Sequence, residues 1–67
     1  MNAKQYLELR GRETAEKVAV KAGTTYGYLY QLALGNRRPR LALAKRLVEA
    51  SNGEMDLASL LTYERAA

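Results

Sequence analysis

The side chains best suited to binding chemistry lie in one stretch of this 67-residue chain, GTTYGYLYQLALGNRRPR, which spans residues 23–40. Helical spacing over residues 26–34 directs four residues outward, namely Tyr26, Gly27, Tyr30 and Gln31. A glutamine amide pairs bidentately with adenine in the major groove of DNA, and a tyrosine ring can lie against a thymine methyl group. We therefore expect these four residues to contact DNA bases.

Gly27 supports this expectation, because glycine inside a helix costs about 1 kcal/mol relative to alanine. That cost is understandable where the backbone must lie close to a base edge or a phosphate. The alternative is that the tyrosines cover an apolar patch and that Gly27 is incidental.

A basic loop follows the same segment, with Arg37, Arg38 and Arg40 within four residues and Asn36 before them. Arginine forks suit phosphate oxygens, and such contacts set the position of a protein on DNA rather than its sequence preference. Pro39 prevents the helix from continuing through this loop. The loop is therefore expected to bind phosphates.

Two further phosphate contacts are expected outside the loop. Thr25 is the predicted N-cap of the helix, and the backbone N–H groups beside it can hold an anion. Lys17 lies near the start of the preceding predicted helix, at the end that crosses the DNA backbone in a helix-turn-helix. The other basic residues are expected to be solvated side chains that add to the positive electrostatic field. Arg12 is the best placed of them to approach the DNA backbone.

The net charge of +4 is unevenly distributed. Residues 1–48 hold ten lysines and arginines against three glutamates, a net +7, whereas residues 49–67 carry a net −3. A polyanion would be steered to the basic part, which contains the stretch described above. The alternative is a basic surface that only contacts solvent. The helix over residues 26–34 and its basic loop favour a nucleic-acid partner over this alternative.

The elements that must position these side chains are predicted to be five short helices, because apolar residues recur at spacings of three and four. Their expected ranges are residues 3–10, 13–22, 26–34, 41–51 and a short last helix that begins after Asp56 and extends to about residue 63. Glycine is expected to end the first and third helices, at Gly11 and Gly35, and Gly23 to form the turn between the second and third. The chain is thus predicted to be a single all-α domain, a bundle containing a helix-turn-helix over residues 13–34.

The same periodicity predicts the core. Expected inward-facing residues are Ala3, Tyr6, Leu7, Ala15, Val18, Ala19, Ala22, Leu29, Leu32, Leu41, Leu43, Ala44, Leu47, Val48, Leu57 and Leu60. A small residue at Ala19 would let the next helix cross closely. Asn2 with Gln5 forms a predicted capping box, and Asp56 is expected to cap the last helix.

Composition excludes several classes of function. The chain has no cysteine and no histidine, so disulfides, zinc-finger ligation and the usual nucleophile–base pairs are absent. We expect no enzymatic activity, no metal or other cofactor and no small-molecule ligand. No apolar run approaches the roughly 20 residues that cross a bilayer, and the charged stretch MNAKQYLELR lacks the apolar segment of a signal peptide. A cytoplasmic location, in a bacterial cell or a phage-infected host, is the expectation.

The segment VAVKAGTTYGYLYQLALGNRRPRLALAKRLVEA resembles the Cro/repressor-type helix-turn-helix domain of phages and bacteria. The resemblance covers about residues 3–52. The matching positions are Val18, Ala19, Gly23, Thr25, Leu29, Leu32, Gly35, Arg38, Pro39, Leu43, Ala44 and Leu47. The ending SNGEMDLASL is similar to a small Cro-like subgroup of prophages.

This resemblance implies a lambda-repressor-like bundle that binds operator DNA, usually as a symmetric dimer, and represses transcription. It places Tyr26, Gly27, Tyr30 and Gln31 where the family contacts bases, and Thr25, Tyr28, Asn36 and Arg38 where it holds phosphates. Aromatic residues replace the polar ones common at positions 26 and 30, so no target sequence carries over. Arg40 stands where a serine or threonine usually caps the next helix.

A homodimer is expected because one recognition helix contacts only a few base pairs. The candidate dimer residues are Leu61 and Tyr63 in the last segment. Two other functions remain open: an antitoxin-type protein that binds DNA and a toxin partner, and a helical protein-interaction module with no role on DNA. The first would call for an additional partner-binding tail, of which this sequence shows almost none, and the second predicts that the basic loop is dispensable.

Overall fold

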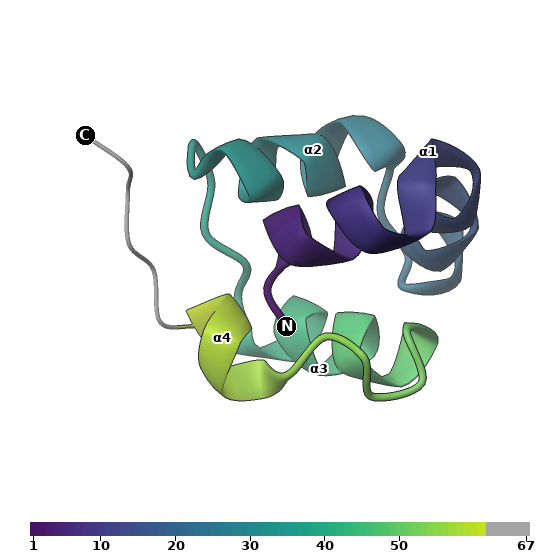
Figure 1. Cartoon of the computed structure of the whole chain (residues 1–67). Helices are drawn as coiled ribbons and strands as arrows, with labels where there is room; N and C mark the ends of the chain where they lie inside the picture. Colours follow the sequence, from purple (N-terminus) through teal and green to yellow (C-terminus); the bar gives the residue numbers. More distant parts are fainter. Residues whose placement is uncertain (62–67) are drawn as a thin grey trace.

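The computed structural model describes residues 1–61, and all the regular structure in that range is helical (Figure 1). Its helices are α1 (Ala3–Lys21), α2 (Tyr26–Leu34), α3 (Leu41–Ala50) and α4 (Leu57–Leu61). α1 packs against α2 and against α3, and α3 packs against α4. None of these helices is long and apolar enough to cross a membrane.

The break predicted at Gly11 is confirmed, but the two helices predicted before residue 22 are joined without a loop in one element, α1. α1 continues through Gly11, which alone departs from helical geometry, with φ 79° and ψ 175°. Because a single left-handed glycine bends the chain without adding a loop, the two expected helices become the two halves of one bent element. Four helices therefore replace the expected five within residues 1–61.

The predicted helix starts are confirmed by hydrogen bonds. The Asn2 side chain accepts from the Gln5 amide N at 2.8 Å, and the Gln5 Oε1 accepts from the Asn2 amide N at 2.9 Å, which completes the capping box of α1. The Asp56 carboxylate likewise accepts from the Ser59 amide N at 2.9 Å at the start of α4.

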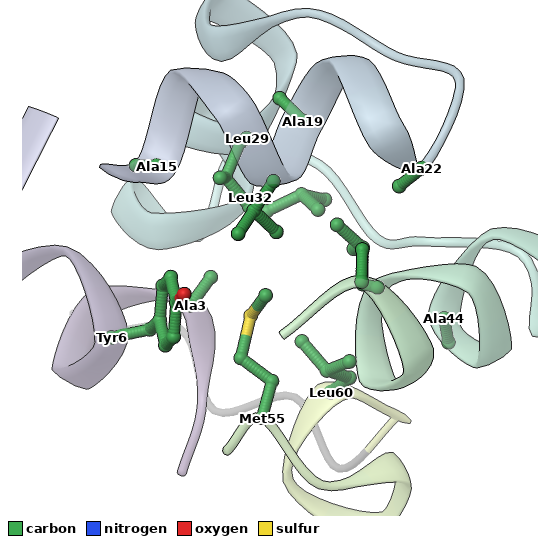
Figure 2. Packing of buried hydrophobic residues seen from close by; sticks show 13 residues of the cluster. Ala3, Tyr6, Ala15, Ala19, Ala22, Leu29, Leu32, Ala44, Met55 and Leu60 are labelled. Carbon is green, nitrogen blue, oxygen red and sulfur yellow. The ribbon is translucent and has the colours of Figure 1, made fainter. Parts of the chain in front are cut away.

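The core is built on small residues of α1 packed against larger ones from the other helices (Figure 2). Ala15 and Ala19 on the second half of α1, and Ala22 directly after it, are at most 1% exposed, and Leu29 of α2 is fully buried. The remaining buried apolar residues are Ala3, Tyr6, Val18, Leu32, Ala44, Leu47, Ala50, Met55 and Leu60. The alanines confirm the prediction that α1 presents a small-residue face to its neighbours.

The predicted core is confirmed for most positions and wrong for one. Leu7, Leu43, Val48 and Leu57 are half-buried against the cluster. Leu41, by contrast, is 51% exposed. It is the first residue of α3, and Ala44 and Leu47 define the inward side of that helix, so Leu41 begins the helix without pointing into the core.

The segment between α3 and α4 is fixed to α1 by polar contacts. The Met1 ammonium donates to Asp56 Oδ1 at 2.5 Å, and this bond, followed by those from Ser59, holds the pKa of the Asp56 carboxyl well below its usual range. Arg10 Nε donates to Glu54 Oε1 at 2.7 Å, and that hydrogen bond lowers the pKa of Glu54. Met1 and Arg10 therefore hold the segment that leads from α3 into α4.

Enlarging Ala19 tests the importance of the small-residue face. We predict that Ala19→Leu lowers the free energy of unfolding by about 1–3 kcal/mol, because the added atoms must enter a fully packed site. Urea unfolding monitored by circular dichroism measures the change. The matched control is Ala42→Leu at an exposed position of α3, where the expected change is within about 0.5 kcal/mol. Equal changes for the two variants would contradict the packing described here.

Candidate nucleic-acid interface

α2 has the bounds that the sequence predicts and is capped at both ends. Thr25 Oγ1 accepts a hydrogen bond from the Tyr28 amide N at 3.2 Å. At the other end the helix stops at Gly35, and the Asn36 amide N donates to the Gln31 carbonyl oxygen at 3.0 Å. These caps fix the register of α2, and so they fix which of its side chains face away from the core.

The two sides of α2 differ in burial. Leu29 and Leu32 lie in the core, at 0% and 8% exposure. On the opposite side Gly27 and Tyr30 are exposed, while Tyr26 and Gln31 are half-buried. The four predicted base-contacting residues therefore share the outward side of α2, with Tyr30 the most exposed large side chain among them at 45%.

Neighbouring side chains cover part of Tyr26. Its ring stacks with that of Tyr30, with centroids 6.0 Å apart and planes 27° apart. The Arg12 guanidinium of α1 lies over the Tyr26 ring, 4.9 Å from its centroid. Arg12 is itself held by Glu16, since its Nε donates to Glu16 Oε1 at 2.7 Å, and this hydrogen bond raises the pKa of Arg12.

The placement of Arg12 was not foreseen from the sequence, which indicated only a general contribution to the basic field. The available signal was the spacing Arg12–Glu16, which predicts a pair along one helix face. The contact with Tyr26 depends on how α1 crosses α2, and no local pattern encodes that crossing. A cation over an aromatic face is attracted to the ring, so Arg12 favours one position of the Tyr26 ring.

The loop after α2 is tied to that helix through two predicted contact residues. Asn36 Nδ2 donates to Gln31 Oε1 at 2.9 Å, and the Tyr28 hydroxyl donates to the Arg38 carbonyl oxygen at 3.3 Å. The first bond uses one lone pair of the Gln31 oxygen, so bidentate pairing of Gln31 with adenine must use the second lone pair or release Asn36. The geometry thus links the outward side of α2 to the loop.

The basic loop lies at the positive end of α3. Arg37, Arg38 and Arg40 are all exposed. Arg40 is the N-cap residue of α3, its side chain makes no capping hydrogen bond, and the first turn contains no acidic residue. Because the N-terminus of a helix carries a partial positive charge, these arginines and the start of α3 together favour a bound anion.

Lys17 lies on the exposed side of α1, with its Nζ 4.0 Å from Glu13 Oε1. An exposed pair at this spacing contributes little to stability, so Lys17 can exchange Glu13 for another anion at low cost.

Among the candidate dimer residues, Leu61 is 43% exposed, and Tyr63 lies outside the described residues.

An open cleft of about 740 Å³ adjoins the outward side of α2. It lies between the first turns of α1, the C-terminal end of α2 and α4, and its lining includes Leu7, Tyr30, Leu34, Arg37 and Leu60. Tyr30 and Arg37 therefore border both the cleft and the predicted DNA-contacting surface.

Comparisons of the chain with models of known protein families, with curated proteins and with solved structures give no match. The function is therefore inferred from the residues of this chain and their geometry.

Replacing Gly27 tests whether this glycine is required by the fold. A methyl group added there meets nothing closer than Thr25 Oγ1 at 3.9 Å. We predict that Gly27→Ala raises the free energy of unfolding by about 0.5–1 kcal/mol, through the higher helix propensity of alanine. The control is Gly23→Ala, where φ is +81° and the same change must destabilise the chain. Urea unfolding of both variants measures the effects, and a loss of stability at Gly27 would contradict the prediction.

Proposed function

We propose that this chain is a sequence-specific DNA-binding protein of the helix-turn-helix type, in which α2 enters the major groove. The second half of α1, the turn at residues 22–25 and α2 form the motif. The observation that carries the proposal is the composition of the outward side of α2. A well-capped helix directs two tyrosines, a glycine and a glutamine away from the core, and it leads directly into a loop with three exposed arginines.

The proposed roles follow from the chemistry of each residue. Tyr26, Tyr30 and Gln31 contact base edges, because aromatic rings accept thymine methyls and an amide pairs with base donors and acceptors. Gly27 lets the backbone of α2 approach the DNA closely. Its cost in helix stability is not explained by crowding within the described residues, since the space around it is open.

The phosphate contacts are proposed to flank this helix on both sides. Arg37, Arg38 and Arg40 supply charge beyond the C-terminal end of α2, beside the positive end of α3. Thr25, the N-cap of α2, and Lys17, on the exposed side of α1, are assigned to the phosphates on the other side. Tyr28 and Asn36 position the loop through their hydrogen bonds and add polar groups for the DNA backbone.

We further propose that two copies bind one palindromic operator and repress transcription by occupying it, as the resemblance to Cro-type proteins implies. Two α2 helices one DNA turn apart, about 34 Å, double the number of base pairs contacted. The exposed Leu61 at the end of α4 is a candidate contact between the copies. The degree of repression would then depend on the concentration of the protein, because that concentration sets how much of the operator is occupied.

Selection from a pool of random duplexes at about 0.15 M salt tests this proposal, because that salt concentration weakens non-specific phosphate contacts. We predict enrichment of a palindrome whose half-sites are about one helical turn apart. A bound but unenriched pool would leave only a non-specific basic protein. No binding would contradict the proposal and favour a protein-interaction module.

Two matched variants, measured on the enriched duplex, locate the phosphate contacts. Arg37→Ala should lower the slope of log affinity against log salt by about 0.9, the value for one lost phosphate contact. Lys21→Ala removes a charge from the last turn of α1, away from the loop in sequence, and should leave the slope nearly unchanged. Equal effects would indicate that general charge, rather than the loop, drives binding.

A further inference from the structure

Among the four predicted base-contacting residues of α2, one offers an exposed apolar surface for direct contact with a ligand. Gly27 has no side chain, Tyr26 is half-buried, and Gln31 is half-buried with its oxygen bonded to Asn36. Tyr30 is 45% exposed. Leu34, one turn further along α2, is 51% exposed and lines the cleft. Among the four predicted base-contacting residues, the ring of Tyr30 is therefore the most exposed apolar group.

The position of that ring is restricted by a chain of contacts from α1. Glu16 holds Arg12 at 2.7 Å, Arg12 lies over the Tyr26 ring, and the Tyr26 ring stacks with Tyr30. Stacking stabilises an aromatic pair beyond the burial of its surface, so the Tyr26 ring restrains the Tyr30 ring. Tyr26 thus acts as a support for Tyr30, and Arg12 is a positioning residue that acts through Tyr26.

The major groove offers few partners for an apolar ring. Base edges there present hydrogen-bond donors and acceptors, and the apolar group among them is the methyl on C5 of thymine. The same methyl is found on 5-methylcytosine. A phenol ring held in place at the middle of the recognition face matches this group better than it matches any other feature of the base edges.

We propose that Tyr30 recognises a pyrimidine 5-methyl group, so that each half-site carries a methylated pyrimidine opposite this residue. The inference rests on the proposed function and makes it more specific, because it names the chemical group that sets sequence preference. The Tyr30 ring, rather than its hydroxyl, is the part that makes the contact.

Replacing single thymines by deoxyuridine in the enriched duplex tests this inference, because that change removes only the methyl group. Burial of one methyl is worth about 0.8 kcal/mol, so we expect a loss of affinity of about fourfold per half-site at one position. In Tyr30→Ala the affinities for the thymine and deoxyuridine duplexes should be equal. In Tyr30→Phe the fourfold preference for thymine should remain.

The source of the methyl is distinguished at the same position by comparing a C·G pair with a 5-methyl-C·G pair. A gain of about fourfold on methylation shows that the methyl is recognised on either base. A loss of affinity for deoxyuridine without this gain restricts the ligand to thymine.

The positioning role of Arg12 predicts that Arg12→Ala reduces the thymine preference. Lys21→Ala should retain the preference, although it also removes one positive charge.

Several outcomes would overturn the inference. They are an enriched half-site without thymine or 5-methylcytosine, no effect of deoxyuridine at any position, the same deoxyuridine loss in Tyr30→Ala, or loss of the preference in Tyr30→Phe. Sequence-specific binding with any of these results leaves the proposed function intact. Absence of sequence-specific binding instead overturns the proposed function, and this inference falls with it.

Discussion

The close packing of the second half of α1 against α2 is the constraint on which the rest of the molecule depends. Ala15 and Ala19 have no exposed surface, and neither has Leu29 of α2. Because a buried alanine leaves no room for a longer side chain, the distance between the two helices is set by these positions. Burial of Leu29 and Leu32 fixes the rotation of α2 about its axis, and so it fixes which side chains of α2 face outward.

Other features of the fold follow from that contact. The bend at Gly11 lets the first half of α1 turn back, so that Ala3 and Tyr6 join the same core from another direction (Figure 2). The hydrogen bonds of Asp56 join the N-terminal residue Met1 to the start of α4, which packs against α3. A small domain has a thin core, and here one bent helix contributes buried residues to it from both of its halves.

The sequence was sufficient for the local structure and for much of the candidate site. Capping residues such as Thr25 and the spacing of Leu29 and Leu32 specify α2 without reference to the rest of the chain. Contacts between helices were not predictable in the same way. The position of Arg12 over Tyr26 depends on the α1–α2 crossing, and the exposure of Leu41 depends on where α3 begins relative to the core.

The most direct test of the account is a map of the backbone amides that respond to DNA. In ¹⁵N-labelled protein titrated with the enriched duplex, the largest chemical-shift changes should fall in residues 25–31 and 36–40, on the outward side of α2 and in the basic loop. Changes confined to the cleft, at residues such as Lys4, Leu7 and Ser59, with α2 unaffected, would contradict the claim that α2 is the recognition helix.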